Sequence, residues 1–125
     1  MAGEIKSYRD LKVWQDAMTL VEDCYRFSQD FPREELYGLM SQIRRAAVSV
    51  PANIAEGYGR NSVDSYVNFL RNSEGSLKEL ETHLILAQRL QFGNFERAEQ
   101  LLTRCEAIVR MLVVLVRSLR SAEEH

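Results

Sequence analysis

The sequence has few of the residues that cross-link or interrupt a small fold. It holds two cysteines, two prolines and six glycines among its 125 residues. A chain of this length can bury an adequate core without disulfides or metal ions. Because proline and glycine are scarce, no low-complexity linker divides the chain. One domain over residues 1–125 is therefore expected.

Long hydrophobic runs are also absent. The longest, Met111 to Val116, has six residues, whereas a membrane-spanning helix needs about 20. The N-terminal residues do not resemble a signal peptide. Cys24 and Cys105 lie within apolar helical patterns, where buried and unreactive thiols are the ordinary case. These features predict a cytoplasmic protein without a membrane partner.

An excess of charge of one sign is missing as well. Sixteen lysines and arginines against 18 aspartates and glutamates give a formal net charge of −2. The overall charge therefore does not favour nucleic-acid binding, and any basic surface must be local.

Residues for catalysis or metal binding are scarce. Only His83 of the two histidines lies inside the chain, so neither the Glu-x-x-His pairs of di-metal bundles nor a zinc-ligand spacing is present. Gly57-Tyr58-Gly59 lacks the lysine and hydroxyl residue of a phosphate-binding loop. We expect no catalytic residue, no metal and no cofactor, and His83 is predicted to pair with Glu79.

Three short breaks divide the chain into four segments with a helical hydrophobic period. The breaks are residues 30–32, 57–61 and 91–94, and the predicted helices span about residues 10–29, 34–57, 62–91 and 95–121. Such short connections favour antiparallel neighbours. The predicted fold is an all-α, up-down antiparallel four-helix bundle.

Pro51 is the one residue that conflicts with this helical pattern. Proline removes a backbone donor, and its ring collides with the carbonyl four residues earlier. The hydrophobic register of Val50 and Ile54 continues through it. We predict one kinked helix, with two shorter helices as the alternative.

Several helices are hydrophobic on more than the single stripe that a bundle requires. The run Met111 to Val116 covers every side of the fourth helix, so Val114 points away from the inward stripe. A strip on the second helix is similarly apolar. We predict self-association through these surfaces, with the interface residues Val48, Pro51, Ala52, Met111 and Val114.

The second helix also carries a polar strip. Short hydrogen-bonding side chains such as Ser49 and Asn53 are poorer helix formers than the glutamates and lysines of ordinary exposed faces. A solvated face, a subunit interface and a polar ligand site are all consistent with it. The strip consists of Gln42, Arg45, Ser49, Asn53 and Glu56, with Arg60 at its end.

Basic residues on the second and fourth helices are nearly all arginine, which suits contacts with phosphate and carboxylate groups. Ordinary ion pairs with Glu99, Glu106 and similar carboxylates are the alternative explanation. The candidate residues for binding nucleic acid or another partner are Arg44, Arg45, Arg60, Arg110 and Arg117.

Three stretches of the sequence match a known pattern. They are Phe31-Pro32, Tyr37-Gly38-Leu39 and the run Gln42-Ile43-Arg44-Arg45-Ala46-Ala47-Val48-Ser49-Val50-Pro51-Ala52-Asn53-Ile54-Ala55-Glu56-Gly57. Shorter matches include Val13-Trp14-Gln15, Gly59-Arg60 and Gly75-Ser76. The chain resembles the bacterial four helix bundle protein family, also called the S23 or 23S rRNA intervening-sequence protein family.

This resemblance implies a four-helix bundle that forms a homopentamer. Members are encoded within intervening sequences of ribosomal RNA genes or as separate chromosomal copies, and their biochemical function is mostly unassigned. The family is similar in fold to the accessory protein of diversity-generating retroelements, a basic pentamer that associates with a reverse transcriptase and nucleic acid. The slightly acidic chain departs from that relative.

The leading functional prediction is a non-enzymatic oligomeric module that docks RNA, a ribonucleoprotein or another nucleic-acid-handling protein. One alternative is a small-molecule-binding protein or enzyme that uses the polar strip of the second helix. Another is a scaffold that binds only proteins.

Overall fold

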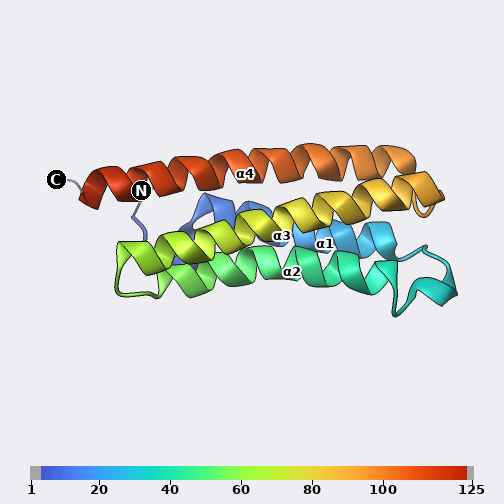
Figure 1. Ribbon diagram of the computed structural model, residues 1–125, viewed down its shortest axis with the longest axis horizontal. Helices are drawn as coiled ribbons and strands as arrows, with labels where there is room; N and C mark the ends of the chain where they lie inside the picture. Colours follow the sequence, from blue (N-terminus) through green and yellow to red (C-terminus); the bar gives the residue numbers. More distant parts are fainter. Residues whose placement is uncertain (1–3, 124–125) are drawn as a thin grey trace.

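The computed structural model describes residues 4–123, and all regular structure within that range is helical. The helices are α1 (Lys12–Ser28), α2 (Leu39–Tyr58), α3 (Val63–Leu90) and α4 (Phe95–Glu123), with 3₁₀ turns at Tyr8–Asp10 and Arg33–Glu35. They run up and down in an elongated bundle (Figure 1). Because α1 and α3 each contact α2 and α4, the helices follow chain order around the bundle. The all-α class with four helices is confirmed.

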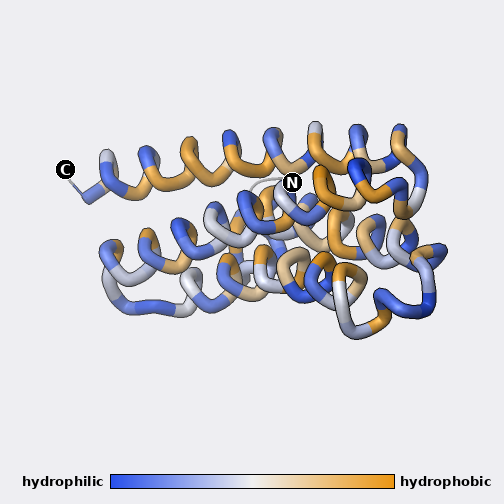
Figure 2. The backbone as a smooth tube through the Cα atoms, turned by 45° about the vertical axis from the view of Figure 1, so that its right-hand side comes forward, coloured by the Kyte–Doolittle hydropathy of each residue, from blue (hydrophilic) through white to orange (hydrophobic). Residues whose placement is uncertain are grey.

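Each helix turns one hydrophobic stripe toward a common core. Fully buried side chains include Leu20 of α1, Ile54 of α2, Leu84 of α3 and Leu112 of α4. Figure 2 shows the hydrophobic residues of α4 gathered on the side that faces the other helices. Burial of each large apolar side chain stabilises the fold by about 1.5–3 kcal/mol. No helix in residues 4–123 is both long enough and hydrophobic enough to cross a membrane.

The tight turn between α3 and α4 packs on the aromatic residues at one end of the bundle core. Gly93 has a positive φ of 74°, a conformation that glycine adopts without strain. A Cβ atom there would lie 2.8 Å from the ring of Phe27 and 3.0 Å from that of Phe31. Asn94 then starts α4, since its side-chain oxygen accepts a hydrogen bond of 2.9 Å from the Arg97 backbone N–H.

The second helix begins later than expected. The predicted start was residue 34, but Arg33–Glu35 forms a 3₁₀ turn and α2 begins at Leu39. The Glu35 carboxylate accepts a hydrogen bond of 2.9 Å from the Leu39 backbone N–H and so caps α2. The other helix ends lie within two residues of the expected positions.

Pro51 lies inside one continuous α2, so the alternative of two shorter helices is wrong. Val50 and Ile54 are fully buried on either side of Pro51, and this packing holds the helical register. The buried Ser73 hydroxyl of α3 donates a hydrogen bond of 2.9 Å to the Val50 carbonyl. Pro51 is itself buried within the chain. It is therefore not available for the subunit interface to which the sequence pattern assigned it.

Candidate interaction surfaces

The polar strip of α2 is partly used inside the chain. The Ser49 and Ser76 hydroxyls, from α2 and α3, lie 2.7 Å apart. The Asn53 side-chain amide donates to the Ser49 carbonyl at 2.8 Å and to its hydroxyl at 3.0 Å. The middle of the strip therefore joins α2 to α3, while Gln42 and Arg45 stay exposed.

The exposed end of this strip borders a shallow polar hollow between α2 and α3, with a volume of about 360 Å³. Known ligand pockets are mostly apolar and span roughly 300–1,000 Å³. This hollow is as large as a small ligand pocket, but its walls are mostly polar, unlike those of typical ligand pockets. It is lined by Gln42, Arg45, Ala46, Ser49, Ser76 and Glu79.

Arg44 and Arg45 are adjacent in sequence but lie in different surroundings. The Arg44 guanidinium donates to the Ser28 hydroxyl at 2.9 Å and to the Tyr25 carbonyl at 3.2 Å. It also stacks over the Tyr25 ring, 4.5 Å from its centre. Arg44 thus caps the C-terminal end of α1, whereas Arg45 is exposed. The sequence pattern had grouped both as partner-binding residues.

The remaining candidate arginines also differ in their partners. Arg60 forms an exposed ion pair of 3.1 Å with Glu56 and lies over the Phe69 ring at 4.6 Å. Arg110 and Arg117 are exposed on α4, and neither has an ion-pair partner among residues 4–123. Pairs with Glu99 and Glu106 are not found among residues 4–123. Arg60, Arg104 and Arg120 do pair with other carboxylates, so ordinary ion pairs account for part of the arginine set.

A hydrophobic hollow of about 600 Å³ lies between α1 and α2, and we call it the α1/α2 hollow. Tyr37 in its wall is 91% exposed, and Val48, a predicted interface residue, is 43% exposed. Ala52, one turn further along α2, is exposed as well. Apolar walls of the hollow are Tyr25, Leu36, Tyr37, Met40 and Val48, and Arg44 and Arg45 lie at its edge.

A second hydrophobic hollow, of about 640 Å³, lies between α1 and α4, and we call it the α1/α4 hollow. Val114 is 63% exposed there, and Met111 is half-buried. Both were predicted interface residues. The apolar walls are Leu11, Val13, Ala107, Met111, Val114 and Leu115.

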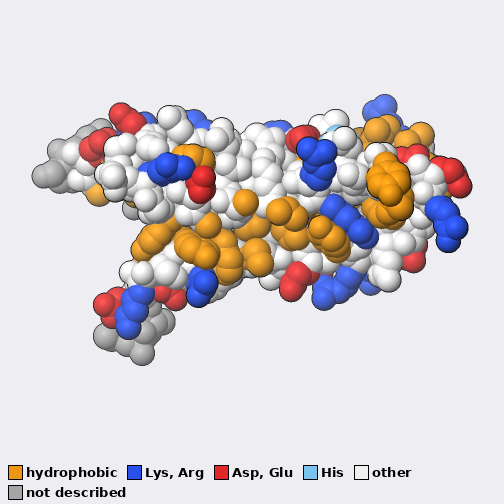
Figure 3. Space-filling model, turned by 90° about the horizontal axis from the view of Figure 1, so that it is seen from below, with side chains coloured by type: hydrophobic (Ala, Val, Ile, Leu, Met, Phe, Trp, Pro, Cys, Tyr) orange, Lys and Arg blue, Asp and Glu red, His pale blue; other side chains and the backbone are white. Residues whose placement is uncertain are grey.

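The two hollows lie on adjacent sides of the bundle because α1 borders both. Viewed from the α2 side, hydrophobic side chains form a band along the molecule, with basic side chains beside it (Figure 3). Exposed apolar surface of this extent is typical of interaction sites rather than of isolated monomers.

The two cysteines are buried in the core. Burial raises the pKa of the Cys24 thiol to about 12, although Arg104 opposes this shift. Burial also raises the pKa of Cys105, with Cys24 adding to the effect. Thiols with such raised pKa values are poor nucleophiles and poor metal ligands at neutral pH.

The His83 side chain does not form the predicted pair with Glu79. Its Nε2 atom is buried and has no hydrogen-bond partner within residues 4–123, while Glu79 lines the polar hollow. No group of three or more His, Cys, Asp or Glu side chains in the described range is arranged to hold a metal ion.

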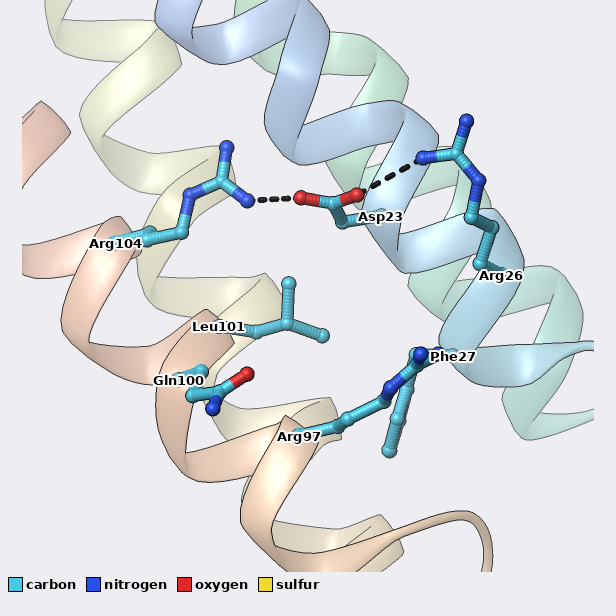
Figure 4. A pocket seen from close by; sticks show the side chains of 7 residues that line it. All are labelled: Asp23, Arg26, Phe27, Arg97, Gln100, Leu101 and Arg104. Atoms are coloured by element: carbon cyan, nitrogen blue, oxygen red, sulfur yellow. Dashed lines mark hydrogen bonds and ion pairs between the residues drawn. The ribbon is translucent and has the colours of Figure 1, made fainter.

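The structure also brings together a cluster of arginines that sequence reasoning missed. Arg26 of α1 and Arg97 and Arg104 of α4 line a small hollow around Asp23 (Figure 4). Asp23 forms ion pairs with Arg26 at 3.0 Å and with Arg104. Only the i,i+3 spacing of Asp23 and Arg26 was visible in the sequence, because Arg104 is distant along the chain.

Comparison with a solved structure places this fold among known proteins. A protein of unknown function from the S23 ribosomal protein family of Bacteroides thetaiotaomicron VPI-5482 superposes with a TM-score of 0.74 at 21% sequence identity. The match covers 83% of this chain and 97% of that chain. At this identity the likeness shows a shared fold. No curated protein matches the chain.

The fold and surfaces thus define an all-α protein of four helices with exposed hydrophobic and arginine-rich surfaces. Residues 9–114 match the family described as 23S rRNA-intervening sequence protein. The chain belongs to this family, as its sequence motifs had indicated. Neither the family description nor the solved relative indicates an enzymatic activity.

Proposed function

We propose that the chain is a non-enzymatic subunit that assembles into a ring of copies and binds RNA or a ribonucleoprotein on that ring. Five copies is the number that the family resemblance implies. The observation that carries the proposal is the pair of hydrophobic hollows on adjacent sides of the bundle, with Val114 63% exposed in one of them.

Two different hydrophobic surfaces favour a ring over a simple dimer. A symmetric dimer needs one self-complementary patch, whereas a head-to-tail contact joins two different patches and closes when the rotation permits. Two adjacent sides of a bundle face clearly different directions. When the two contact surfaces of a subunit differ in direction, each copy is rotated relative to the one before it, and a ring of few copies can close. We therefore propose that the α1/α2 hollow of one copy packs on the α1/α4 hollow of the next.

The RNA part of the proposal is supported by exposed arginines. Arg45, Arg110 and Arg117 have no ion-pair partner among the described residues, and a ring repeats each of them once per copy. Arg45 and Arg110 line the α1/α2 and α1/α4 hollows, so they lie beside the proposed contact between copies, while Arg117 lines neither hollow. Repetition produces a strong local positive field even though each chain has a slight negative charge. The family name also links its members to 23S rRNA.

Native mass spectrometry tests the assembly. Wild-type protein is expected to give one oligomer with the mass of five chains, and Val114→Asp is expected to give monomers because it places a charge in the interface. Ile85→Asp is the matched control, since Ile85 is 42% exposed on α3 and lines neither hollow. An oligomer unchanged by Val114→Asp would contradict the proposed contact.

Filter binding to single-stranded RNA tests the second part. The triple variant Arg45→Ala, Arg110→Ala, Arg117→Ala is expected to weaken binding at least about tenfold at low salt, and to reduce its salt dependence. Because Arg45 and Arg110 line the two hollows, native mass spectrometry must show the wild-type oligomer for this variant before the loss is assigned to RNA contacts. Arg71→Ala, an exposed arginine on α3, is the control. If wild-type protein retains no RNA at low salt, the RNA part is wrong and a protein-only scaffold becomes the better description.

The polar hollow between α2 and α3 favours a second candidate, a site for a small polar ligand. Arg45 and Glu79 line this hollow with opposite charges, which suits a zwitterionic molecule. Native mass spectrometry under gentle conditions would detect a bound small molecule, and Glu79→Gln should release it. Identical masses for native and denatured-then-refolded chains would remove this candidate.

A further inference from the structure

Three arginines cluster between α1 and α4, outside the two hydrophobic hollows that form the proposed subunit contact. Arg26 lies in the last turn of α1, and Arg97 and Arg104 lie in the first half of α4. They surround a hollow of about 190 Å³ in which Asp23 is the one acidic lining residue. Three guanidinium groups against one carboxylate leave an excess of positive charge.

Asp23 neutralises only part of this charge and also fixes its geometry. Figure 4 shows its carboxylate between the guanidinium groups of Arg104 and Arg26, bonded to each through a different oxygen. A guanidinium has several N–H donors in a rigid plane. Each of these two arginines therefore keeps free donors, while Asp23 limits the rotation of both side chains.

Arg97 is the third and uncommitted member of the cluster. Its guanidinium has no hydrogen bond or ion pair within residues 4–123, although its backbone N–H is used by the Asn94 cap. It extends from the first turn of α4 toward α1 (Figure 4). The positive end of the α4 dipole lies at this turn and favours an anion.

The floor of the hollow strengthens these electrostatic interactions. Phe27 and Leu101 line it and are 3% and 4% exposed, so water is excluded from one side. Charge-assisted hydrogen bonds are stronger beside such apolar surface than in open water. Gln100 adds a side-chain amide at the rim.

We propose that Arg26, Arg97 and Arg104 form a binding site for a phosphoryl group. Arginine matches phosphate oxygens in bidentate geometry, and a tetrahedral oxyanion offers enough oxygens for three guanidinium groups at once. The hollow is smaller than the pockets of drug-sized ligands, so it accommodates one phosphoryl group rather than a whole cofactor. Two sources of the phosphoryl group fit this site. An RNA backbone is the source if the proposed function holds, and a small phosphate ester is a source that does not depend on the proposed function.

Titration with inorganic phosphate, followed by the NMR signals of the arginine side chains, tests the site directly. Wild-type protein is expected to show saturable shifts at Arg26, Arg97 and Arg104. Arg97→Ala is expected to weaken phosphate binding about tenfold, because one charge-assisted contact is lost. Arg97→Lys should recover part of this loss, since it restores the charge without the bidentate geometry. Arg71→Ala should bind as wild type does.

A parallel filter-binding arm with single-stranded RNA identifies the source of the phosphoryl group. Weaker RNA binding by Arg97→Ala assigns the site to the RNA backbone. Weaker phosphate binding with unchanged RNA binding by Arg97→Ala assigns the site to a small phosphate ester. This assignment does not depend on how the Arg45, Arg110 and Arg117 variants bind RNA. Wild-type affinity for both probes in Arg97→Ala overturns the proposal.

Discussion

The groove between α1 and α4 changes its chemistry from one end to the other. At the end where α1 begins, Leu11 and Val13 meet Val114 in an exposed hydrophobic hollow. At the end where α1 finishes, Arg26 meets Arg97 and Arg104 around Asp23. The same two antiparallel helices therefore present a surface suited to another protein chain at one end and a surface suited to an anion at the other.

This difference separates residues that hold the fold from residues that serve a partner. Leu112 and Val114 are two positions apart on α4, yet Leu112 is fully buried and Val114 is 63% exposed. At the arginine end, Leu101 is buried while Arg97, four residues earlier, is exposed. Substitutions on each side of this division should have different consequences.

The largest expected effect on folding is that of Leu112→Ala. Removing a fully buried leucine should lower the free energy of unfolding by about 2–5 kcal/mol, as measured by urea denaturation. Val114→Ala should leave the stability of the isolated chain within about 0.5 kcal/mol of wild type, measured at a concentration below that of assembly. Equal losses for both variants would contradict the division between core and interface.

Alkaline pH should have the next largest effect, through the two buried thiols, Cys24 and Cys105. Burial raises their pKa values above the ordinary thiol value of 9.0, for Cys24 to about 12, so the folded state retains protons that the unfolded state loses. The stabilisation is complete below about pH 9 and is lost as the pH rises toward 12, by about 1.4 kcal/mol per pH unit for each thiol. Cys24→Ala should make the urea midpoint fall less steeply between about pH 9 and 12 than it does in wild type. Parallel pH profiles for the variant and wild type would contradict a contribution from Cys24.

Asp23→Asn should have a smaller effect on stability. Its ion pairs with Arg26 and Arg104 involve partly exposed side chains, and such pairs contribute about 0–1 kcal/mol. The loss should shrink in high salt, because salt screens the wild-type pairs. Chemical denaturation at low and high salt would measure this, and a loss above about 3 kcal/mol would make Asp23 a major structural residue.

Arg97→Ala should have the smallest effect on folding. Its side chain has no partner in the described chain, and the backbone cap from Asn94 does not depend on it. The free energy of unfolding in phosphate-free buffer should stay within about 0.5 kcal/mol of the wild-type value. The melting temperature should accordingly be close to that of wild type. A clear loss of stability there would indicate that Arg97 supports the fold instead of a ligand.

The helices and the core could be predicted from the local pattern of the sequence. The helical hydrophobic period predicted the four helices, and it left Val114 outside the inward stripe of the fourth helix, where Val114 is 63% exposed. The start of α2 was misplaced because the Glu35 cap and the preceding 3₁₀ turn depend on local geometry that periodicity does not report. Pro51 was misassigned because the helical-wheel position does not tell which neighbouring helix covers it.

The candidate sites were less predictable, since they depend on contacts between distant segments. Arg44 and Arg45 look equivalent in sequence, but only the packing of α2 against α1 directs Arg44 to the Tyr25 carbonyl. Ser49 and Asn53 were singled out in the sequence as poor helix formers, but the contact of Ser49 with Ser76 of α3 and the hydrogen bonds from Asn53 to Ser49 were not visible there.

The sequence by itself determined the number of helices, their inward faces and the family to which the chain belongs, because these follow from local periodicity and a continuous motif. Only the tertiary structure decided which charged and polar residues come together. The hydrophobic effect is roughly proportional to buried area and can be read from spacing along one helix. Ion pairs and hydrogen bonds depend on direction and distance across helices, so Asp23 and Arg104 meet only once the bundle is formed.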